Sequence, residues 1–211
     1  VDETRFRPQP QPELARSLGI DPETFVVGFV GRFVPEKGLL ALANALEQLR
    51  DRRWKWLLLG RGDLKPELEK WAQDRDLSDR LLWVESVPHD DVPRYMNLLD
   101  ALILPSETTY RFKTLTAAGW KEQFGHVLIE AMACRVPVVG SDCGEIPHAI
   151  GDGGLTFPEG DVTALRDTLA QLIDDRDRAA QIAQRGYDRA MHHYTNRALA
   201  QQLLEFYRKL S

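Results

Sequence analysis

Cysteine is scarce in this sequence: only Cys134 and Cys143 occur among its 211 residues. They show neither the spacing of metal ligands nor a cluster of histidines beside them. The pattern therefore predicts neither a disulfide framework nor a zinc site, and it indicates a reduced, cytoplasmic protein.

Long apolar runs and basic runs are also missing. No apolar stretch approaches the roughly 18 residues that a membrane helix needs, and the start, Val1 to Phe6, does not resemble a secretory signal. Lysine and arginine form no basic run, and the net charge is −5. We therefore predict no transmembrane segment and no nucleic-acid partner.

The composition that remains is that of a globular chain, with 43% hydrophobic and 28% charged residues. This length can bury one substantial core. Residues 1–12 carry three prolines among polar residues and are predicted to be a linker or an extended arm. Residues 13–211 then form one domain. Because the chain begins on Val1-Asp2 without methionine, we expect it to have been cut from something longer.

Short apolar runs alternate with helical patterns along the whole domain. This alternation predicts an α/β fold: a doubly wound parallel sheet of about six strands. The predicted strands are 25–30, 56–59, 81–84, 101–104, 136–139 and 154–157. Helices are predicted at 13–18, 39–49, 64–74, 92–99 and around Glu130, and the C-terminal segment is helical at 162–173, 178–192 and 197–210.

Unusual loops follow several of these strands, at the edge of a sheet where open α/β folds bind ligands. Arg32 and Lys37, between Gly31 and Gly38, flank a turn just before a helix. Two cations beside free helix N–H groups make a diphosphate site. The alternative for either residue alone is a solvated surface charge.

The stretch from Glu122 to Cys134 is the most informative. Phe124-Gly125 begins a predicted helix of about ten residues that is apolar nearly all round and is therefore expected to be buried. Glu130 lies within it, and a buried carboxylate needs hydrogen-bond donors. A ribose diol would supply two hydroxyls; the alternative is a glutamate that caps backbone N–H groups.

Two carboxylates eight residues apart around Phe124-Gly125, followed by Val136-Pro137-Val138-Val139, resemble the E-x7-E signature of retaining GT-B glycosyltransferases, family 4 in particular. Gly31-Arg32 and Glu36-Lys37-Gly38 are similar to that family's G-R-x-x-x-x-K-G segment. Such enzymes have two Rossmann-like domains, and this chain resembles the C-terminal, donor-binding one over residues 1–210. An N-terminal acceptor-binding domain would be missing.

The resemblance implies a role for each motif. The donor diphosphate would be bound by Arg32 and Lys37 and by the backbone at Gly125, His126 and Val127. Glu130 would take the ribose hydroxyls, and Glu122 would be the catalytic carboxylate beside the transferring sugar. His126 is interpreted as a solvated or capping residue. The base would contact Gly62, Leu64, Ser86 and Val87. We expect no metal and no cofactor, since the nucleotide sugar is a substrate.

The function implied is that of the donor-binding half of an enzyme that moves a sugar from a UDP or GDP sugar to an acceptor hydroxyl with retention. This fragment alone would be inactive. The protein would be cytoplasmic, and peripheral at the inner membrane face if the acceptor is a lipid. Two alternatives stay open: a non-catalytic nucleotide-binding module, and a sugar phosphorylase with free phosphate between Arg32 and Lys37.

Some features depart from the family pattern. Arg135 stands where a glycine is usual, His148 stands where a glutamate is usual, and the loop from Ser106 to Lys121 is unusually long. A loop of this length without secondary structure is a lid or is disordered. The last helix carries an apolar stripe that we expect to pack on this domain or on a second copy, as a homodimer; its members are Leu199, Leu203, Leu204, Phe206, Tyr207 and Leu210.

Overall fold

The computed structural model describes residues 1–113 and 118–210. Its centre is a six-stranded sheet in the order β3-β2-β1-β4-β7-β8, with every neighbouring pair parallel. The strands are β1 (Phe25–Arg32), β2 (Trp54–Arg61), β3 (Leu81–Val84), β4 (Ala101–Leu104), β7 (Val138–Ser141) and β8 (Leu155–Phe157). The predicted doubly wound sheet is thus confirmed.

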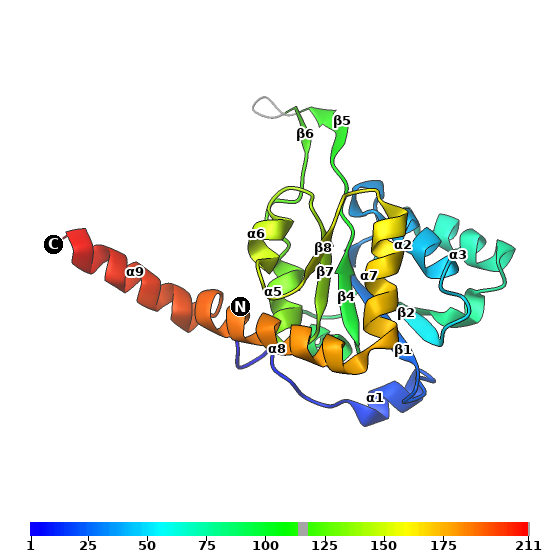
Figure 1. Cartoon of the computed structure of the whole chain (residues 1–211), viewed down its shortest axis with the longest axis horizontal. Helices are drawn as coiled ribbons and strands as arrows, with labels where there is room; N and C mark the ends of the chain where they lie inside the picture. The colour runs from blue at the N-terminus through cyan, green and yellow to red at the C-terminus, as the bar shows by residue number, and fades with distance from the viewer. Residues whose placement is uncertain (114–117, 211) are drawn as a thin grey trace.

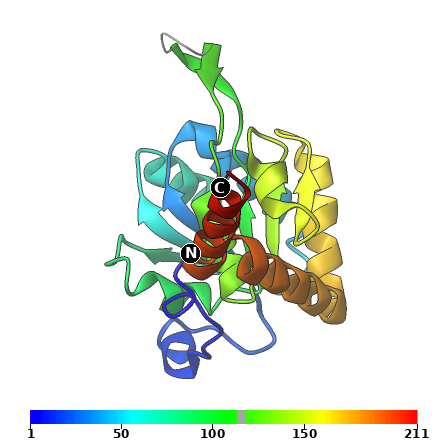
Figure 2. The same ribbon diagram turned by 90° about the vertical axis from the view of Figure 1, so that its left-hand side faces the viewer.

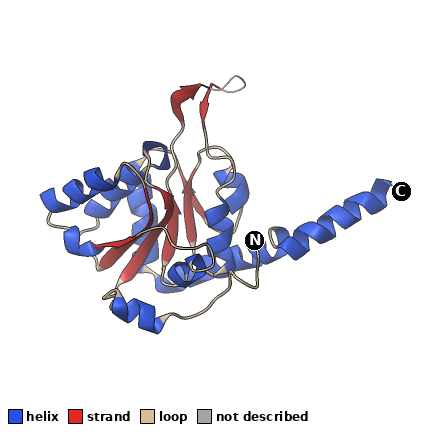
Figure 3. Ribbon diagram, turned by 180° about the vertical axis from the view of Figure 1, so that it is seen from behind, coloured by secondary structure: helices blue, strands red, loops and turns tan. Residues whose placement is uncertain are grey.

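Helices cover both faces of the sheet (Figure 1, Figure 3). On one side lie α2 (Leu39–Glu47), α3 (Lys65–Asp74) and α7 (Val162–Asp174), and on the other lie α5 (His126–Ala133) and α6 (Ile146–Ile150). The short α4 (Val92–Met96) precedes β4. Strands covered on both faces bury successive side chains, which is why Phe25, Val26 and Val27 form a continuous apolar run and are at most 1% exposed.

The chain reverses its direction across the sheet between β1 and β4. Strands β2 and β3 extend the sheet on one side of β1, and β7 and β8 extend it on the other side of β4. The carboxyl ends of β1 and β4 are therefore the topological switch point, where open α/β sheets leave a crevice. The site residues should gather there.

The segment between Ser106 and Lys121 is not a structureless loop, so that part of the prediction was wrong. It contains an antiparallel hairpin, β5 (Thr109–Lys113) and β6 (Ala118–Trp120), which projects from the carboxyl edge of the sheet (Figure 1). The Tyr110 ring lies against Gly119 on the opposite strand, a cross-strand contact of an aromatic ring with a glycine. Residues 114–117 lie outside the described part of the chain.

The N-terminal residues lie on the body of the protein. Phe6 is 2% exposed, and the Asn97 amide bridges the backbone by donating to Arg7 O at 3.0 Å and accepting from Gln9 N–H at 2.7 Å. The chain then enters α1 (Pro12–Ser17) and reaches β1. The elements η1 (Pro35–Lys37) and η2 (Ser78–Arg80) are single 3₁₀ turns.

At the C-terminus, α8 (Arg176–His193) packs on α5, whereas α9 (Asn196–Leu210) extends away from the body (Figure 1) and is seen nearly end-on in Figure 2. Leu199, Leu203, Leu204, Phe206 and Tyr207 are each between 48% and 60% exposed. The prediction that this stripe packs on its own domain was wrong, while packing on a second copy stays a prediction. Among the described helices, none combines the length and the apolar character needed to cross a membrane.

The end of α5 makes a tight turn although Arg135 stands where the family usually has glycine. Arg135 has φ 57°, its N–H donates to Met132 O, and Val136 N–H donates to Ala131 O. This is the Schellman pattern, which normally places glycine at the left-handed position. The guanidinium lies 4.7 Å above the Tyr187 ring of α8, a contact that helps to hold arginine there.

Candidate functional site

The loop after β1 carries both predicted diphosphate cations. Arg32 is the last residue of β1, is exposed, and has no ion-pair partner among the described residues. Lys37 ends η1 and is followed by Gly38 in the left-handed conformation at φ 65°. A Cβ on Gly38 would lie 1.8 Å from Pro105 O, so only glycine lets this turn approach the end of β4 so closely.

Lys37 reaches the predicted catalytic carboxylate. Its ammonium forms an ion pair with Glu122, and the two side chains are only 15% and 11% exposed. The same carboxylate oxygen accepts a hydrogen bond of 3.0 Å from the Ser106 hydroxyl. Ser106 is fully buried just beyond β4, so three separate segments meet at the switch point.

A cavity of about 330 Å³ lies beside this cluster, at the carboxyl ends of β1, β2 and β3. It is lined by Val30, Gly31, Arg32, Leu59, Gly60, Arg61, Ser86 and Val87. The structure thus brings the predicted base residues Ser86 and Val87 to the same cavity as Arg32. It places Gly62 and Leu64 beside the carbonyl of Phe33 instead: Leu64 N–H donates to Phe33 O at 3.0 Å, and the Leu64 side chain is 6% exposed.

The beginning of α5 supplies the predicted backbone donors. Gly125 is the N-cap residue at φ 74°, and the first turn closes with Leu128 N–H donating to Gly125 O at 2.8 Å. The backbone N–H groups of His126 and Val127 lie in the first turn of α5, where N–H groups have no acceptor within the helix. The His126 side chain is exposed and its ring lies 4.9 Å from Phe124, which suits a surface residue better than a base.

Glu130 is held in the helix without the donors that a carboxylate needs. Its side chain is 18% exposed, and it has no hydrogen bond within the described residues. Burial raises the pKa of Glu130 to about 7. The Nε2 atom of His89 lies 4.0 Å from Glu130 Oε1. His89 belongs to the segment after β3, which also carries Ser86 and Val87.

These contacts join most of the predicted site residues into one region, without Gly62 and Leu64. The cavity links Arg32 to Ser86 and Val87, the segment after β3 links the cavity to Glu130, and Lys37 links the first loop to Glu122. Sequence reasoning missed Arg61, His89 and Ser106, and it also missed Trp120, whose ring centroid lies 5.1 Å from the Lys37 ammonium nitrogen. Ser106 could have been found, because it follows a buried strand as the other site loops do.

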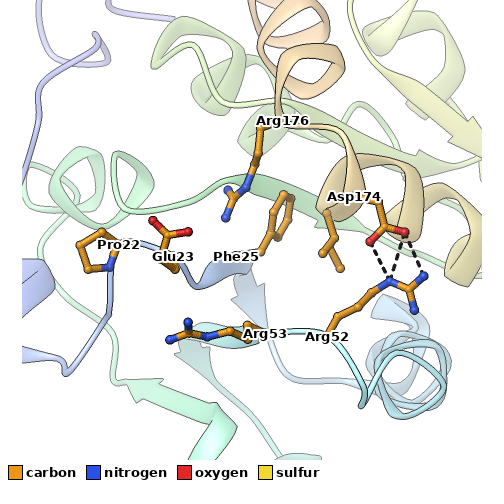
Figure 4. A pocket seen from close by; sticks show the side chains of 8 residues that line it. Pro22, Glu23, Phe25, Arg52, Arg53, Asp174 and Arg176 are labelled. Carbon is orange, nitrogen blue, oxygen red and sulfur yellow. Dashed lines mark hydrogen bonds and ion pairs between the residues drawn. The ribbon is translucent and has the colours of Figure 1, made fainter.

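A larger cavity, of about 510 Å³, lies at the opposite edge of the sheet beside the start of β1 (Figure 4). Its arginines are neutralised by acidic neighbours: Arg52 pairs with Asp174 at 2.9 Å and Arg176 pairs with Asp100 at 2.6 Å. No predicted site residue lies there, so its size does not make it the candidate site.

Within residues 1–113 and 118–210, no group of three or more His, Cys, Asp or Glu side chains is arranged to hold a metal ion. Positive charge at the candidate site comes from Arg32, Arg61 and Lys37 and from the first turn of α5. These groups suit an anionic ligand.

The sequence model of the family "Glycosyl transferases group 1" matches residues 10–189. The chain belongs to this glycosyltransferase family. Among curated relatives of this glycosyltransferase chain is the GDP-mannose-dependent alpha-(1-6)-phosphatidylinositol monomannoside mannosyltransferase of Mycobacterium tuberculosis. It is 30% identical over 99% of this chain and 54% of its own length.

Solved glycosyltransferase structures agree on the fold. The HepE protein of Anabaena, solved in complex with UDP and glucose, is 25% identical with a TM-score of 0.82, over 99% of this chain and 55% of that one. The C-terminal domain of a group 1 glycosyltransferase from Francisella tularensis is 23% identical with a TM-score of 0.78, over 93% of this chain and 99% of that domain. The chain spans about half the length of the curated relatives it matches.

Proposed function

We propose that this chain binds the nucleoside diphosphate sugar of a retaining glycosyltransferase, whose acceptor is bound by a part outside the chain. The observation that carries this is Glu130: a carboxylate with little exposure and no hydrogen bond within the described residues. Buried polar groups are normally satisfied. A ribose offers two hydroxyls on adjacent carbons, which is the donor set that this carboxylate needs.

The rest of the region fits the other parts of such a donor. Arg32 and the first turn of α5 suit a diphosphate, because cations and free helix N–H groups both stabilise phosphate oxygens. The cavity beside Ser86 and Val87 is wide enough for a base. The bound UDP of the HepE complex supports the same ligand class.

In sugar transfer the nucleoside diphosphate is the leaving group, and negative charge grows on it as the bond to the sugar breaks. Preorganised positive groups stabilise such charge. We assign this role to Arg32, Lys37 and the α5 N-terminus. We assign Glu122 a place beside the sugar, where it would orient the ring; its ion pair with Lys37 holds the carboxylate in place. Retention and the nucleotide-sugar substrate rest on the family motif and on these placements.

Thermal-shift titrations with UDP, GDP and ADP test the proposal. We expect one nucleoside diphosphate to raise the melting temperature clearly, because a ligand at a hundred times its Kd adds about 2.7 kcal/mol of stability. Glu130→Gln should weaken that nucleotide but leave inorganic diphosphate unaffected, since only the nucleotide has a ribose.

Lys37→Ala should weaken both ligands by about ten- to a hundredfold, as expected for losing a charged hydrogen bond of about 1.5–3 kcal/mol. Matched controls are Glu205→Gln on the exposed α9 and Lys70→Ala on the exposed face of α3. Equal losses of nucleotide and bare diphosphate on Glu130→Gln would refute the ribose assignment. Binding of free phosphate with no response to any nucleotide would favour the phosphorylase instead.

A further inference from the structure

The projecting hairpin brings an aromatic ring to the lysine of the diphosphate site. Trp120 is the last residue of β6, and its ring centroid lies 5.1 Å from the Lys37 ammonium nitrogen. The tryptophan is half-buried. A cation within about 6 Å of the centroid and over the face of a tryptophan is attracted by the electron-rich ring.

Lys37 therefore has two different partners. One is the Glu122 carboxylate, itself fixed by the Ser106 hydroxyl at 3.0 Å. The other is the Trp120 ring. The carboxylate competes with a phosphate for the ammonium, because it takes an N–H and neutralises the charge. The ring attracts the ammonium without accepting a full hydrogen bond and without cancelling its charge.

Both ends of the hairpin are anchored to the body, so the position of the ring is set by the fold. At the first end, the N–H and the hydroxyl of Thr108 both donate to Glu159 Oε2 at 2.8 Å. Glu159 is held in turn, since its N–H donates to Asp142 Oδ1 at 2.7 Å. At the second end, Glu145 N–H donates to Glu122 O at 3.0 Å.

We infer that Trp120 is a positioning residue for the donor diphosphate, acting through Lys37. Its ring holds the lysine side chain extended towards the switch point and leaves ammonium N–H groups available to phosphate oxygens. Without the ring, the flexible side chain regains rotamers that binding must then remove, and the ammonium turns fully to Glu122. This inference rests on the proposed function, because it needs an anionic ligand at Lys37.

The test is the affinity of a Trp120→Leu variant, measured by isothermal titration calorimetry. The ligands are inorganic diphosphate and the nucleoside diphosphate that the wild-type chain binds. We expect both affinities to fall by roughly two- to thirtyfold, the range that a cation–π contact supports. Trp120→Phe keeps an aromatic face and should restore most of the loss. The matching nucleoside without phosphates should bind both variants equally.

A double-mutant cycle separates this role from a merely structural one. In a Lys37→Ala background, Trp120→Leu should cause no further loss of diphosphate affinity. Trp83→Leu is the matched control, because Trp83 is another half-buried tryptophan with a lysine, Lys65, 5.4 Å from its ring centroid. It should leave inorganic diphosphate binding unchanged.

Three results would overturn the inference. In the first, Trp120→Leu binds diphosphate and the nucleoside diphosphate as tightly as the wild-type chain does. The inference then fails, but the proposed function stays intact. In the second, Trp120→Leu lowers the diphosphate affinity as much in the Lys37→Ala background as in the wild type. The ring would then act on binding by a route other than Lys37. If neither a nucleoside diphosphate nor inorganic diphosphate binds the wild-type chain, the proposed function and this inference fail together.

Discussion

The buried Glu130 carboxylate destabilises the ligand-free protein, and the size of this effect depends on pH. Burial raises the pKa of Glu130 to about 7, from about 4.5 for an exposed glutamate. Between these two values the folded state keeps a proton that the unfolded state has lost. The free energy of unfolding therefore falls as the pH rises through this window. The penalty is absent below about pH 4.5 and complete above about pH 7.

Glu130→Gln removes the charge, so we expect it to stabilise the ligand-free protein at pH 8. The upper bound is about 3.5 kcal/mol, from roughly 1.4 kcal/mol for each unit of pKa. At pH 4.5 the variant and the wild type should have nearly the same stability. Urea denaturation at the two pH values measures this. A glutamine variant that is less stable than wild type at pH 8 would show that the carboxylate is satisfied in the free protein.

Arg135 offers a second test at the scale of one residue. Its φ of 57° costs a non-glycine residue about 1–2 kcal/mol, and its stacking on Tyr187 returns about 0.5–1 kcal/mol. Arg135→Ala keeps the backbone strain and loses the stacking on Tyr187. Arg135→Gly removes the strain as well as the stacking, but it also gives more conformational freedom to the unfolded chain.

We expect Arg135→Ala to be about 1 kcal/mol less stable than Arg135→Gly, with the glycine variant close to wild type. Chemical denaturation of the three proteins provides the comparison. If alanine and glycine were equally stable here, the left-handed turn at the end of α5 would not be retained in solution.

Among the secondary-structure elements, those set by a strong local pattern were predicted well. The predicted strand 81–84 is the observed β3, and the helix predicted at 162–173 differs from α7 by one residue. Strand β3 was predicted well because its apolar residues form one continuous run. Helix α7 was predicted well because its start is marked by Asp161, whose side chain caps the helix by accepting from Ala164 N–H.

The hairpin was missed because the sequence from Ser106 to Lys121 contains no Asn-Gly or Asp-Gly pair, and because the two strands are short. Contacts between distant segments could not be predicted either. The sequence placed Lys37 and Glu122 at one edge of the sheet, but nothing in it indicates that the two side chains pair. The exposure of α9 could not be predicted for the same reason. The periodicity of its residues shows that one face is apolar, but it does not show which surface, if any, that face packs against.

That stripe leads to a prediction about α9. An exposed apolar face of this kind favours association, so we expect the chain to self-associate at micromolar concentrations through Leu203, Leu204 and Phe206. Light scattering on the wild type and on Leu203→Glu with Phe206→Glu would test it. The control is Glu205→Gln on the same helix. A monomeric wild type would mean that no second copy covers the stripe.

At the scale of the whole molecule, binding and catalysis should separate. The donor groups that we assign all belong to this chain, whereas the curated relatives it matches are about twice as long. Transfer requires an acceptor held against the sugar, and proximity alone can supply about 7–11 kcal/mol of a barrier. This chain should therefore bind the nucleotide sugar and transfer almost none of it.

Release of the nucleoside diphosphate, with and without an added acceptor, measures that expectation. Transfer by this chain at ordinary enzyme rates would show that the acceptor site lies within it. A longer protein that contains this chain and still fails to transfer sugar would favour the non-catalytic nucleotide-binding module.

The anchored hairpin is a segment where insertions and deletions can be tolerated as the protein evolves. Its two ends are tied down independently, one through Glu159 and the other through the backbone at Glu145. Because the entropy of closing a loop grows only slowly with its length, residues can be gained or lost between these ties without moving Glu122. Length variation concentrated here would therefore change the surface beside Glu122 while the residues that we assign to the donor, Arg32, Lys37 and Glu130, keep their places in the body.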